Sequence, residues 1–351
     1  MRKIFSLFSI FSFIFLLFTS AAEAQLNFYF INVGQGDATY IELPNGKNAL
    51  IDGGPTNKVI AQFLTEKNIH EIDYVVLTHP HSDHYIGLKK VFKMAKVKHF
   101  YDSKAENISA KGDNTVRDQA AQQGTQIHFP KIGSKLPWDK SVDIKVLNTC
   151  EHYIESRNNS VLNNCSIVLK FTYNGTSVLM MGDAETQAEN GMILRFPNEL
   201  KAYALKVGHH GSDTASSAPF LEKVRPAVAI LSFGANNKYG HPDYYALMRL
   251  QAVNAKLYAT QDGTQTLFLP APSKTIPATQ PSVQVYNPEA QQPLLFDIAT
   301  TPQPVKVNIP MMTEEQKAVK NKKSGRLLKS LDNLKNTGNE RATSVEQPML
   351  F

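Results

Sequence analysis

Six consecutive residues hold many of the side chains in this 351-residue chain that could do chemistry. The segment from His79 to His84 reads HPHSDH, so three imidazoles and a carboxylate stand close together. It follows the apolar run from Tyr74 to Leu77, which predicts a buried strand that ends in this loop. In such a loop His79 and His81 can point to one place while Asp83 and His84 point to a second. We therefore predict two metal ions about 3.5–4 Å apart, an arrangement that activates water for hydrolysis; the alternative is a surface histidine cluster without metal.

Two ions need ligands from elsewhere in the chain. Asp183 follows an expected strand at 177–181 and precedes an expected helix at 185–194, so it is either a metal ligand or the N-cap of that helix. His209 and His210 follow an expected strand at 204–207. Adjacent side chains on an extended backbone point to opposite sides, so only one of the two histidines should contact a metal directly.

The H-x-H-x-D-H motif at 79–84 resembles that of the metallo-β-lactamase superfamily, and the resemblance extends from about residue 28 to residue 269. Three further motifs resemble the extracytoplasmic hydrolase domain of the ComEC competence proteins and occur also in phosphorylcholine esterases of bacterial surfaces: NVGQGDA at 32–38, LIDGG at 50–54 and KVGHHGS at 206–212. The resemblance implies an α/β protein with a four-layer αββα metallo-β-lactamase fold and two mixed β-sheets. Short strand and helix patterns in two successive halves also favour a layered α/β protein, with hairpins at Asn45-Gly46 and Asn174-Gly175.

The resemblance also implies roles for single residues. The expected metal ligands are six side chains: His79, His81, Asp83, His84, Asp183 as the bridge between the ions, and His210. The expected catalytic groups, besides Asp83, are His209 and His241, the latter either as a last metal ligand or as a proton donor. From the residues alone, His241 could equally be a helix-entry histidine beside Pro242.

Two acids are expected to support the ligands. Asp52, at a strand end before Gly53-Gly54, should orient the histidine loop through hydrogen bonds. Asp37 is expected to act similarly or to be a turn residue. Many superfamily members have a further histidine where this chain reads Asn163-Asn164-Cys165, so we expect a more open shell and exchangeable binding at the first metal. Asn164 either contacts substrate or is an ordinary residue at a strand edge.

The implied activity is hydrolysis of a phosphodiester, either single-stranded DNA or a phosphocholine-type ester, by a metal-bridging hydroxide. Zn²⁺ is the first expectation for the two divalent ions and Mn²⁺ the alternative. A lactonase or β-lactamase-like hydrolase is the alternative enzyme, although an Asp in place of a thiol ligand argues against β-lactam substrates. A metal-stabilised DNA-uptake or surface-binding protein without catalysis is the alternative outside enzymes.

The first 24 residues have the pattern of a cleaved signal peptide. Two basic residues precede an apolar run at 4–18, and Ala22-Glu23-Ala24 forms a small-x-small cleavage site. The alternative is an uncleaved anchor, but the run is shorter than the ~20 residues that span a bilayer. We expect a secreted or periplasmic protein whose mature chain has no transmembrane span. In that compartment Cys150 and Cys165 favour a disulfide over two free thiols.

Composition divides the rest of the chain. Residues 25–270 are the expected hydrolase domain, 271–310 a Pro/Gln-rich linker or extension, and 311–351 a basic tail that is helical or disordered. The net charge of +6 belongs mostly to the C-terminal end, because residues 301–351 hold nine basic and five acidic residues, whereas 25–300 hold 26 and 25. The tail is therefore the expected contact for a polyanion or an anionic membrane surface.

Overall fold

The computed structural model describes residues 24–270 and 281–286. The expected signal peptide (apart from Ala24), the greater part of the linker stretch and the whole basic tail lie outside these residues. Within them no helix is long and apolar enough to cross a membrane. The helices are α1 Asn57–Glu66, α2 Ser82–Tyr85, α3 Leu88–Met94, α4 Gly112–Gln122, α5 Asn159–Asn163, α6 Thr186–Arg195, α7 Ala218–Val224 and α8 Tyr244–Ala252, with 3₁₀ turns at Gly208–Gly211 and Thr260–Asp262.

The first large sheet has the strand order β16-β15-β1-β2-β3-β4-β5-β7. Its β1, β2, β3, β15 and β16 pair antiparallel, whereas β3, β4, β5 and β7 run parallel to one another. The sheet is therefore mixed, as expected. Its strands are β1 Leu26–Phe30, β2 Thr39–Glu42, β3 Asn48–Ile51, β4 Glu71–Leu77, β5 Lys96–Asp102, β7 Gln126–His128, β15 Thr264–Leu269 and β16 Ser282–Tyr286.

The second large sheet has the order β14-β13-β12-β11-β10-β8 and is also mixed, because β8, β10 and β11 pair antiparallel while β11 to β14 run parallel. Both Asn-Gly hairpins are confirmed: Asn45-Gly46 joins β2 to β3, and Asn174-Gly175 joins β10 to β11. The strands are β8 Val142–Asn148, β10 Val168–Tyr173, β11 Thr176–Met180, β12 Ala204–Lys206, β13 Val228–Leu231 and β14 Lys256–Ala259; a small separate sheet pairs β6 Ala105–Asn107 with β9 Ile154–Ser156.

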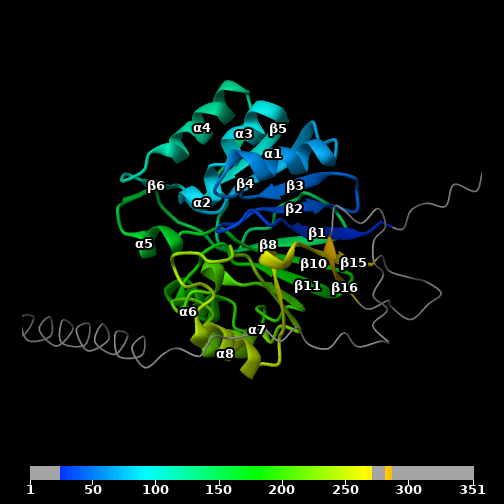
Figure 1. Cartoon of the computed structure of the whole chain (residues 1–351), viewed down its shortest axis with the longest axis vertical. Helices are drawn as coiled ribbons and strands as arrows, with labels where there is room; N and C mark the ends of the chain where they lie inside the picture. The colour runs from blue at the N-terminus through cyan, green and yellow to red at the C-terminus, as the bar shows by residue number, and fades with distance from the viewer. Residues whose placement is uncertain (1–23, 271–280, 287–351) are drawn as a thin grey trace, which may run out of the picture. The chain divides into compact units, whose positions relative to one another are not determined.

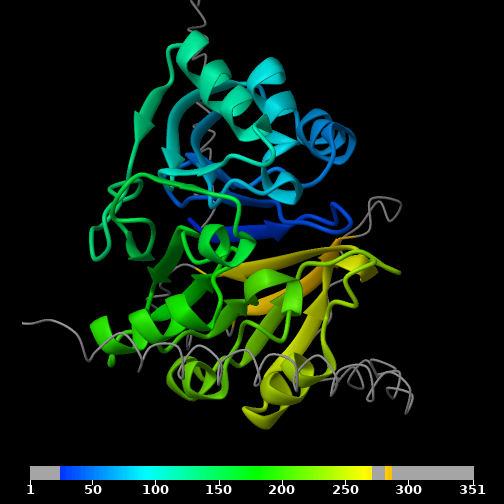
Figure 2. The same cartoon turned by 90° about the vertical axis from the view of Figure 1, so that its left-hand side faces the viewer.

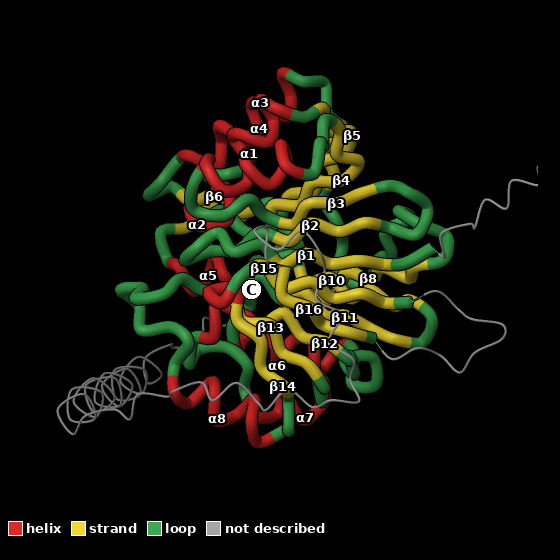
Figure 3. The backbone as a smooth tube through the Cα atoms, turned by 45° about the vertical axis from the view of Figure 1, so that its right-hand side comes forward, coloured by secondary structure: helices red, strands yellow, loops and turns green. Residues whose placement is uncertain are grey.

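The two sheets stack face to face between two layers of helices, which confirms the four-layer αββα architecture (Figure 1, Figure 3). The alternating side chains of β1 and of the residue after it reach both cores: Leu26, Phe28 and Phe30 pack between the sheets, whereas Tyr29 and Ile31 pack with α1, α3 and α4. The inter-sheet core includes the single tryptophan, Trp138, which is 1% exposed. Helices α6, α7 and α8 cover the outer face of the second sheet (Figure 2).

Parallel strands from both sheets end on the same side of the molecule, and the loops that follow them carry the candidate chemistry. The loop after β4 holds the histidine motif, the turn after β11 holds Asp183, and the 3₁₀ turn after β12 holds His209 and His210. Because ligands of α/β proteins bind beyond the carboxyl ends of parallel strands, this edge is where a site is expected.

Candidate metal centre

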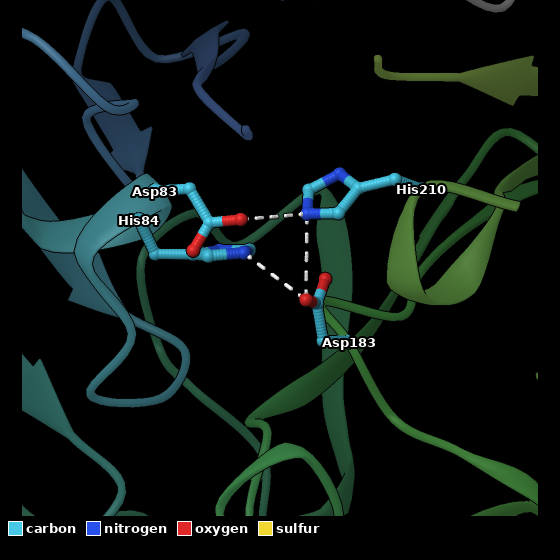
Figure 4. A group of neighbouring side chains, drawn as sticks. All are labelled: Asp83, His84, Asp183 and His210. Carbon is cyan, nitrogen blue, oxygen red and sulfur yellow. Dashed lines mark ion pairs between the residues drawn. The ribbon is translucent and has the colours of Figure 1, made fainter. Parts of the chain in front are cut away.

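Side chains from three loops converge on one carboxylate. Asp83 and His84 lie on the short helix α2, His210 lies in the 3₁₀ turn after β12, and Asp183 follows β11 (Figure 4). His210 Nε2 lies 3.2 Å from Asp83 Oδ2 and 3.4 Å from Asp183 Oδ2. His84 Nε2 lies 3.3 Å from the same Asp183 oxygen. The four donor atoms all lie within 4.8 Å of one another, so this first group could hold one ion.

A second group shares Asp183 with the first. It consists of His79, His81 and Asp183, again with donor atoms within 4.8 Å of one another. His79 Nε2 lies 3.7 Å from Asp183 Oδ2 and 3.0 Å from His81 Nδ1. This second group corresponds to the metal position for which the sequence predicts a more open ligand shell. It has three members, whereas the first group has four.

The donor spacing fits metal coordination. Ligand bonds of about 2.0–2.1 Å in tetrahedral geometry keep the ligand atoms about 3.3 Å apart, and the first group has separations of 3.2, 3.3 and 3.4 Å. Several buried atoms that could bind a metal also have no hydrogen-bond partner among the residues that the structure describes, including Nε2 of His81, His84 and His210 and Oδ1 of Asp183. Buried polar atoms rarely stay unpaired. The cluster therefore has the composition and spacing of the dinuclear site expected for this fold.

Charge within the cluster is mutually compensated. Burial opposes ionisation of Asp183, but His210 and His84 outweigh it and hold the pKa of this carboxyl well below its usual range. Burial likewise opposes protonation of His210, but Asp183 and Asp37 outweigh it and raise the pKa of His210 to about 10. By contrast, burial lowers the pKa of His79 well below its usual value and also lowers the pKa of His81, so both imidazoles are neutral ligands. Metal binding at the first group would then release protons.

Asp52 anchors the histidine loop. Its carboxylate accepts hydrogen bonds from Thr78 N at 2.9 Å and Thr78 Oγ1 at 2.7 Å, and it lies 2.8 Å from His84 Nδ1. These contacts fix the face that His84 presents to Asp183. The neighbouring Gly53 lets this segment approach the backbone of the histidine loop closely. Its N–H donates to His84 O at 2.7 Å, and a Cβ on Gly53 would stand only 2.5 Å from Leu88 N.

Asp37 lies behind His210 and forms a buried ion pair that sequence reasoning missed. Its carboxylate is paired with Lys206 Nζ, and its Oδ1 lies 3.6 Å from His210 Nδ1. Lys206 is 2% exposed and also donates to Val207 O at 3.0 Å. His210 Nδ1 itself lies 2.8 Å from Ser232 O. A lysine inside the apolar run ALKV was the available sign of this pair, since lysine is almost never fully buried unless it is paired.

His209 stands beside the cluster and not within it. Its Nε2 is 4.0 Å from Asp183 Oδ2, and its Nδ1 is 3.3 Å from Glu185 Oε1 and 3.1 Å from Thr214 Oγ1. Asn163 Nδ2 donates to the same Glu185 oxygen at 2.7 Å. The structure thus brings His210 into the metal group and leaves His209 facing it. No local pattern in the sequence pointed to Glu185, whereas Asn163 lies in the stretch where many superfamily members have a further histidine.

His241 lies next to both histidines. Its ring centroid is 5.4 Å from that of His209 and 6.4 Å from that of His210. Burial and the neighbouring histidines lower the pKa of His241 to about 4, so it is a neutral imidazole. Within the described part of the chain its Nδ1 has no hydrogen-bond partner. It does not cap α8, because Asp243 is the N-cap and accepts from Tyr245 N at 2.8 Å.

Two of the open alternatives are now decided by geometry. Asp183 does not cap α6, whose N-cap is Glu185; its carboxylate faces the histidines instead. Asn164 has a structural role, because its Oδ1 accepts from Glu185 N at 3.2 Å and Ala188 N at 2.9 Å at the start of α6. The asparagine that faces the site is Asn163. Cys150 and Cys165 form a disulfide beside these residues.

Comparison with known proteins places this geometry in a family. Residues 31–235 match the metallo-β-lactamase superfamily. The chain is 33% identical over 254 residues to ComE operon protein 3 of Bacillus subtilis, covering 67% of this chain and 32% of that protein. It is 29% identical over 238 residues to competence protein ComA of Neisseria gonorrhoeae, covering 65% and 30%. The chain thus spans about a third of the length of these relatives.

Among solved structures, the metallo hydrolase Igni18 from Ignicoccus hospitalis is similar, with 15% identity, a TM-score of 0.45, and coverage of 74% of this chain and all of that one. The motifs, the αββα layers and the sequence match agree with one another. The chain therefore belongs to the metallo-β-lactamase superfamily, in which it is a distant homologue of the ComEC-like competence proteins.

Proposed function

We propose that this protein is an extracytoplasmic metal-dependent phosphodiesterase that acts on DNA. The observation that carries the proposal is one carboxylate: Asp183 Oδ2 lies 3.7 Å or less from Nε2 of His79, His84 and His210, and Asp183 belongs to both ligand groups. Such a shared carboxylate is suited to bridge two ions. Membership of the metallo-β-lactamase superfamily supports the coarser class, a metal-dependent hydrolase.

The metal would be held by His79, His81 and Asp183 at one position and by Asp83, His84, His210 and Asp183 at the other. Two divalent ions supply an acidified water and positive charge for the ester oxygens. Imidazole and carboxylate ligands suit Zn²⁺, with Mn²⁺ as the alternative. The buried pairs Asp52–His84 and Asp37–Lys206 keep two of the loops in place before substrate arrives.

His209 is the chain's candidate for moving a proton. Glu185 and Thr214 hold its Nδ1, so its Nε2 faces the cluster from the partly exposed side. We assign His209, when both of its ring nitrogens carry a proton, to donate the proton at Nε2 to the leaving oxygen and to keep the one at Nδ1. His241, whose pKa is lowered to about 4, is uncharged at neutral pH and suits the role of a further ligand or substrate contact better than that of an acid.

The substrate class rests on the relatives. One of them is named a competence protein, ComA of Neisseria gonorrhoeae, which supports DNA as the ester to test first. A phosphocholine-type ester and a lactone remain in the substrate screen as competitors. The N-terminal pattern of residues 1–24 supports export, so that the site would meet its substrate outside the cytoplasm.

The test combines metal analysis with turnover of bis-p-nitrophenyl phosphate, followed by single-stranded DNA, p-nitrophenylphosphocholine and a lactone. Asp83→Ala and His84→Ala should each lower turnover by roughly 100-fold or more, at least the loss seen when an outer partner of a metal ligand is removed. The matched control is His70→Ala, because His70 is exposed and its side chain bonds only to Asn68 among the hydrogen bonds described. Bound metal with no turnover of any ester would favour a binding protein, and failure to retain metal would refute the proposal.

A further inference from the structure

An exposed tyrosine stands beside the candidate metal centre. Tyr239 is 58% exposed, although large hydrophobic and aromatic side chains are mostly covered in this fold. Its ring lies nearly parallel to that of His241, with centroids 5.8 Å apart and an interplanar angle of 24°. His241 in turn is stacked at 6.4 Å and 28° on His210, a member of the first ligand group. A row of three rings thus leads from the buried cluster to the surface.

The loop that presents Tyr239 is tightly organised. The Asn237 side chain makes four hydrogen bonds: its Oδ1 accepts from Tyr239 N and His241 N, each at 3.1 Å, and its Nδ2 donates to Gly234 O at 2.9 Å and His241 O at 2.6 Å. A ring held out of the core by an ordered backbone loses little conformational freedom when it binds a ligand. This is the arrangement expected of a binding surface.

The same loop is fastened to the N-terminal motif. Gly234 N donates to Gln35 Oε1 at 3.2 Å, and a Cβ on Gly234 would stand only 2.7 Å from Gln35 N. Gln35 precedes Gly36 and Asp37, whose backbones meet the metal loop, since Asp37 N donates to Asp83 O at 3.2 Å. The loop that carries Tyr239 is therefore connected to the metal loop by a chain of hydrogen bonds that includes the side chains of Asn237 and Gln35.

The positive charge of Lys238 next to the Tyr239 ring indicates which class of ligand this ring binds. An exposed aromatic ring can stack on a nucleobase or hold a quaternary ammonium such as choline. Lys238 Nζ lies over the Tyr239 ring, 5.1 Å from its centroid, so this lysine must move toward a phosphate when a base stacks on that face. This ammonium repels a cationic head group and attracts a phosphate. The pair therefore favours a nucleic acid over a phosphocholine ester.

We propose that Tyr239 is the stacking surface for a nucleobase next to the scissile phosphate, with Lys238 on the neighbouring backbone phosphate, so that the substrate is a single-stranded nucleic acid. This inference rests on the proposed phosphodiesterase function and sharpens its substrate class. The ring would take any base, because every base has a flat face, and so would confer no sequence preference.

The experiment compares strands with and without bases. Zinc-loaded protein is titrated with fluorescent phosphorothioate strands of ten thymidines or ten abasic residues, which resist hydrolysis, and binding is read by anisotropy. We expect the thymidine strand to bind about 5- to 150-fold more tightly, the range that stacking of one base provides. Tyr239→Ala should bring this ratio close to one, while Tyr239→Phe should keep it.

The matched control is Phe129→Ala. Phe129 is 49% exposed and has Lys104 Nζ 5.5 Å from its ring centroid, so it repeats the lysine-aromatic pair in the loop after β7. This variant should keep the wild-type ratio. A wild-type ratio of one, or a ratio that Tyr239→Ala leaves unchanged, would overturn the inference.

Two further outcomes separate the inference from the function on which it rests. If bis-p-nitrophenyl phosphate is hydrolysed but the binding ratio is one, the phosphodiesterase stands and the stacking role fails. If no ester is hydrolysed yet the ratio depends on Tyr239, the function fails and a base-binding surface remains. Faster turnover of p-nitrophenylphosphocholine than of thymidine strands, lost in Tyr239→Ala, would assign the ring to a choline head group and overturn the inference.

Discussion

The buried pair of Lys206 and Asp37 allows a quantitative prediction for Lys206→Met. The two side chains are 2% and 6% exposed, and methionine replaces the lysine stem with little change in volume. The substitution leaves the Asp37 carboxylate buried without its partner and removes the donor to Val207 O. Breaking a buried ion pair from one side costs about 3–5 kcal/mol. We therefore expect the free energy of unfolding to fall by that amount.

The assay is urea unfolding of chelator-treated protein, followed through the fluorescence of Trp138. Metal is removed because ligand binding to the folded state would add its own stability. Trp138 is the single tryptophan and lies in the inter-sheet core, so it reports loss of the packing between the sheets. The control is Lys135→Met, which breaks an exposed pair with Asp143 and should cost less than about 1 kcal/mol.

A second substitution separates charge from packing. In Lys206→Met with Asp37→Asn the uncompensated charge is gone, so we expect more than half of the lost stability to return. A loss below about 1 kcal/mol in Lys206→Met, or a double variant no more stable than the single one, would refute the reasoning that Lys206 neutralises Asp37.

Three more predictions follow from the same contacts. In metal-free protein the pKa of His210 is raised from 6.5 to about 10, so its stabilising contribution is complete below pH 6.5 and is lost as pH rises toward 10. The thermal unfolding midpoint should therefore fall between these pH values, and it should fall less in His210→Gln. The same pH dependence of the midpoint in both proteins would contradict the prediction. Replacing Cys150 and Cys165 by serine opens a loop of sequence separation 15, which should lower the free energy of unfolding by about 3 kcal/mol; an unchanged urea midpoint in oxidising buffer would speak against it. Deleting residues 302–351 removes nine basic and five acidic residues. The deletion should weaken binding of a thymidine 30-mer at low salt and leave turnover of bis-p-nitrophenyl phosphate unchanged. The same DNA affinity in the full chain and the deletion variant would reject a role for the tail.

The fold was predictable where local pattern and burial agree. Asn174 and Gly175 both have positive φ, 46° and 75°, which is the turn that an Asn-Gly pair between two strands predicts. Strand β5 at Lys96–Asp102 was missed, because lysines break up its apolar residues and its parallel neighbours β4 and β7 supply the pairing. Strand β16 at Ser282–Tyr286 was missed as well, since it lies in the Pro/Gln-rich stretch and exists through pairing with β15.

The candidate site, like the fold, could be predicted from the sequence only in part. The residues at 79–84 were predictable because their ligand types are concentrated in one short segment. The family resemblance already predicted His210, and not His209, as the ligand. The argument from an extended backbone did not apply, because both residues have positive φ, 47° for His209 and 55° for His210. Lys206, Glu185 and Asn163 act through contacts between loops distant in sequence, which no spacing rule could reveal.

The central claim is that Asp183 bridges two metal ions. The most direct measurement is the metal content of protein reconstituted with Zn²⁺ and freed of excess metal, for the wild type, Asp183→Asn and the control Asp118→Asn, whose side chain is exposed on α4. We predict two ions per chain in the wild type and the control, and fewer than one in Asp183→Asn, because both ligand groups contain this carboxylate. One ion or none in the wild type, or two retained by Asp183→Asn, would contradict the account.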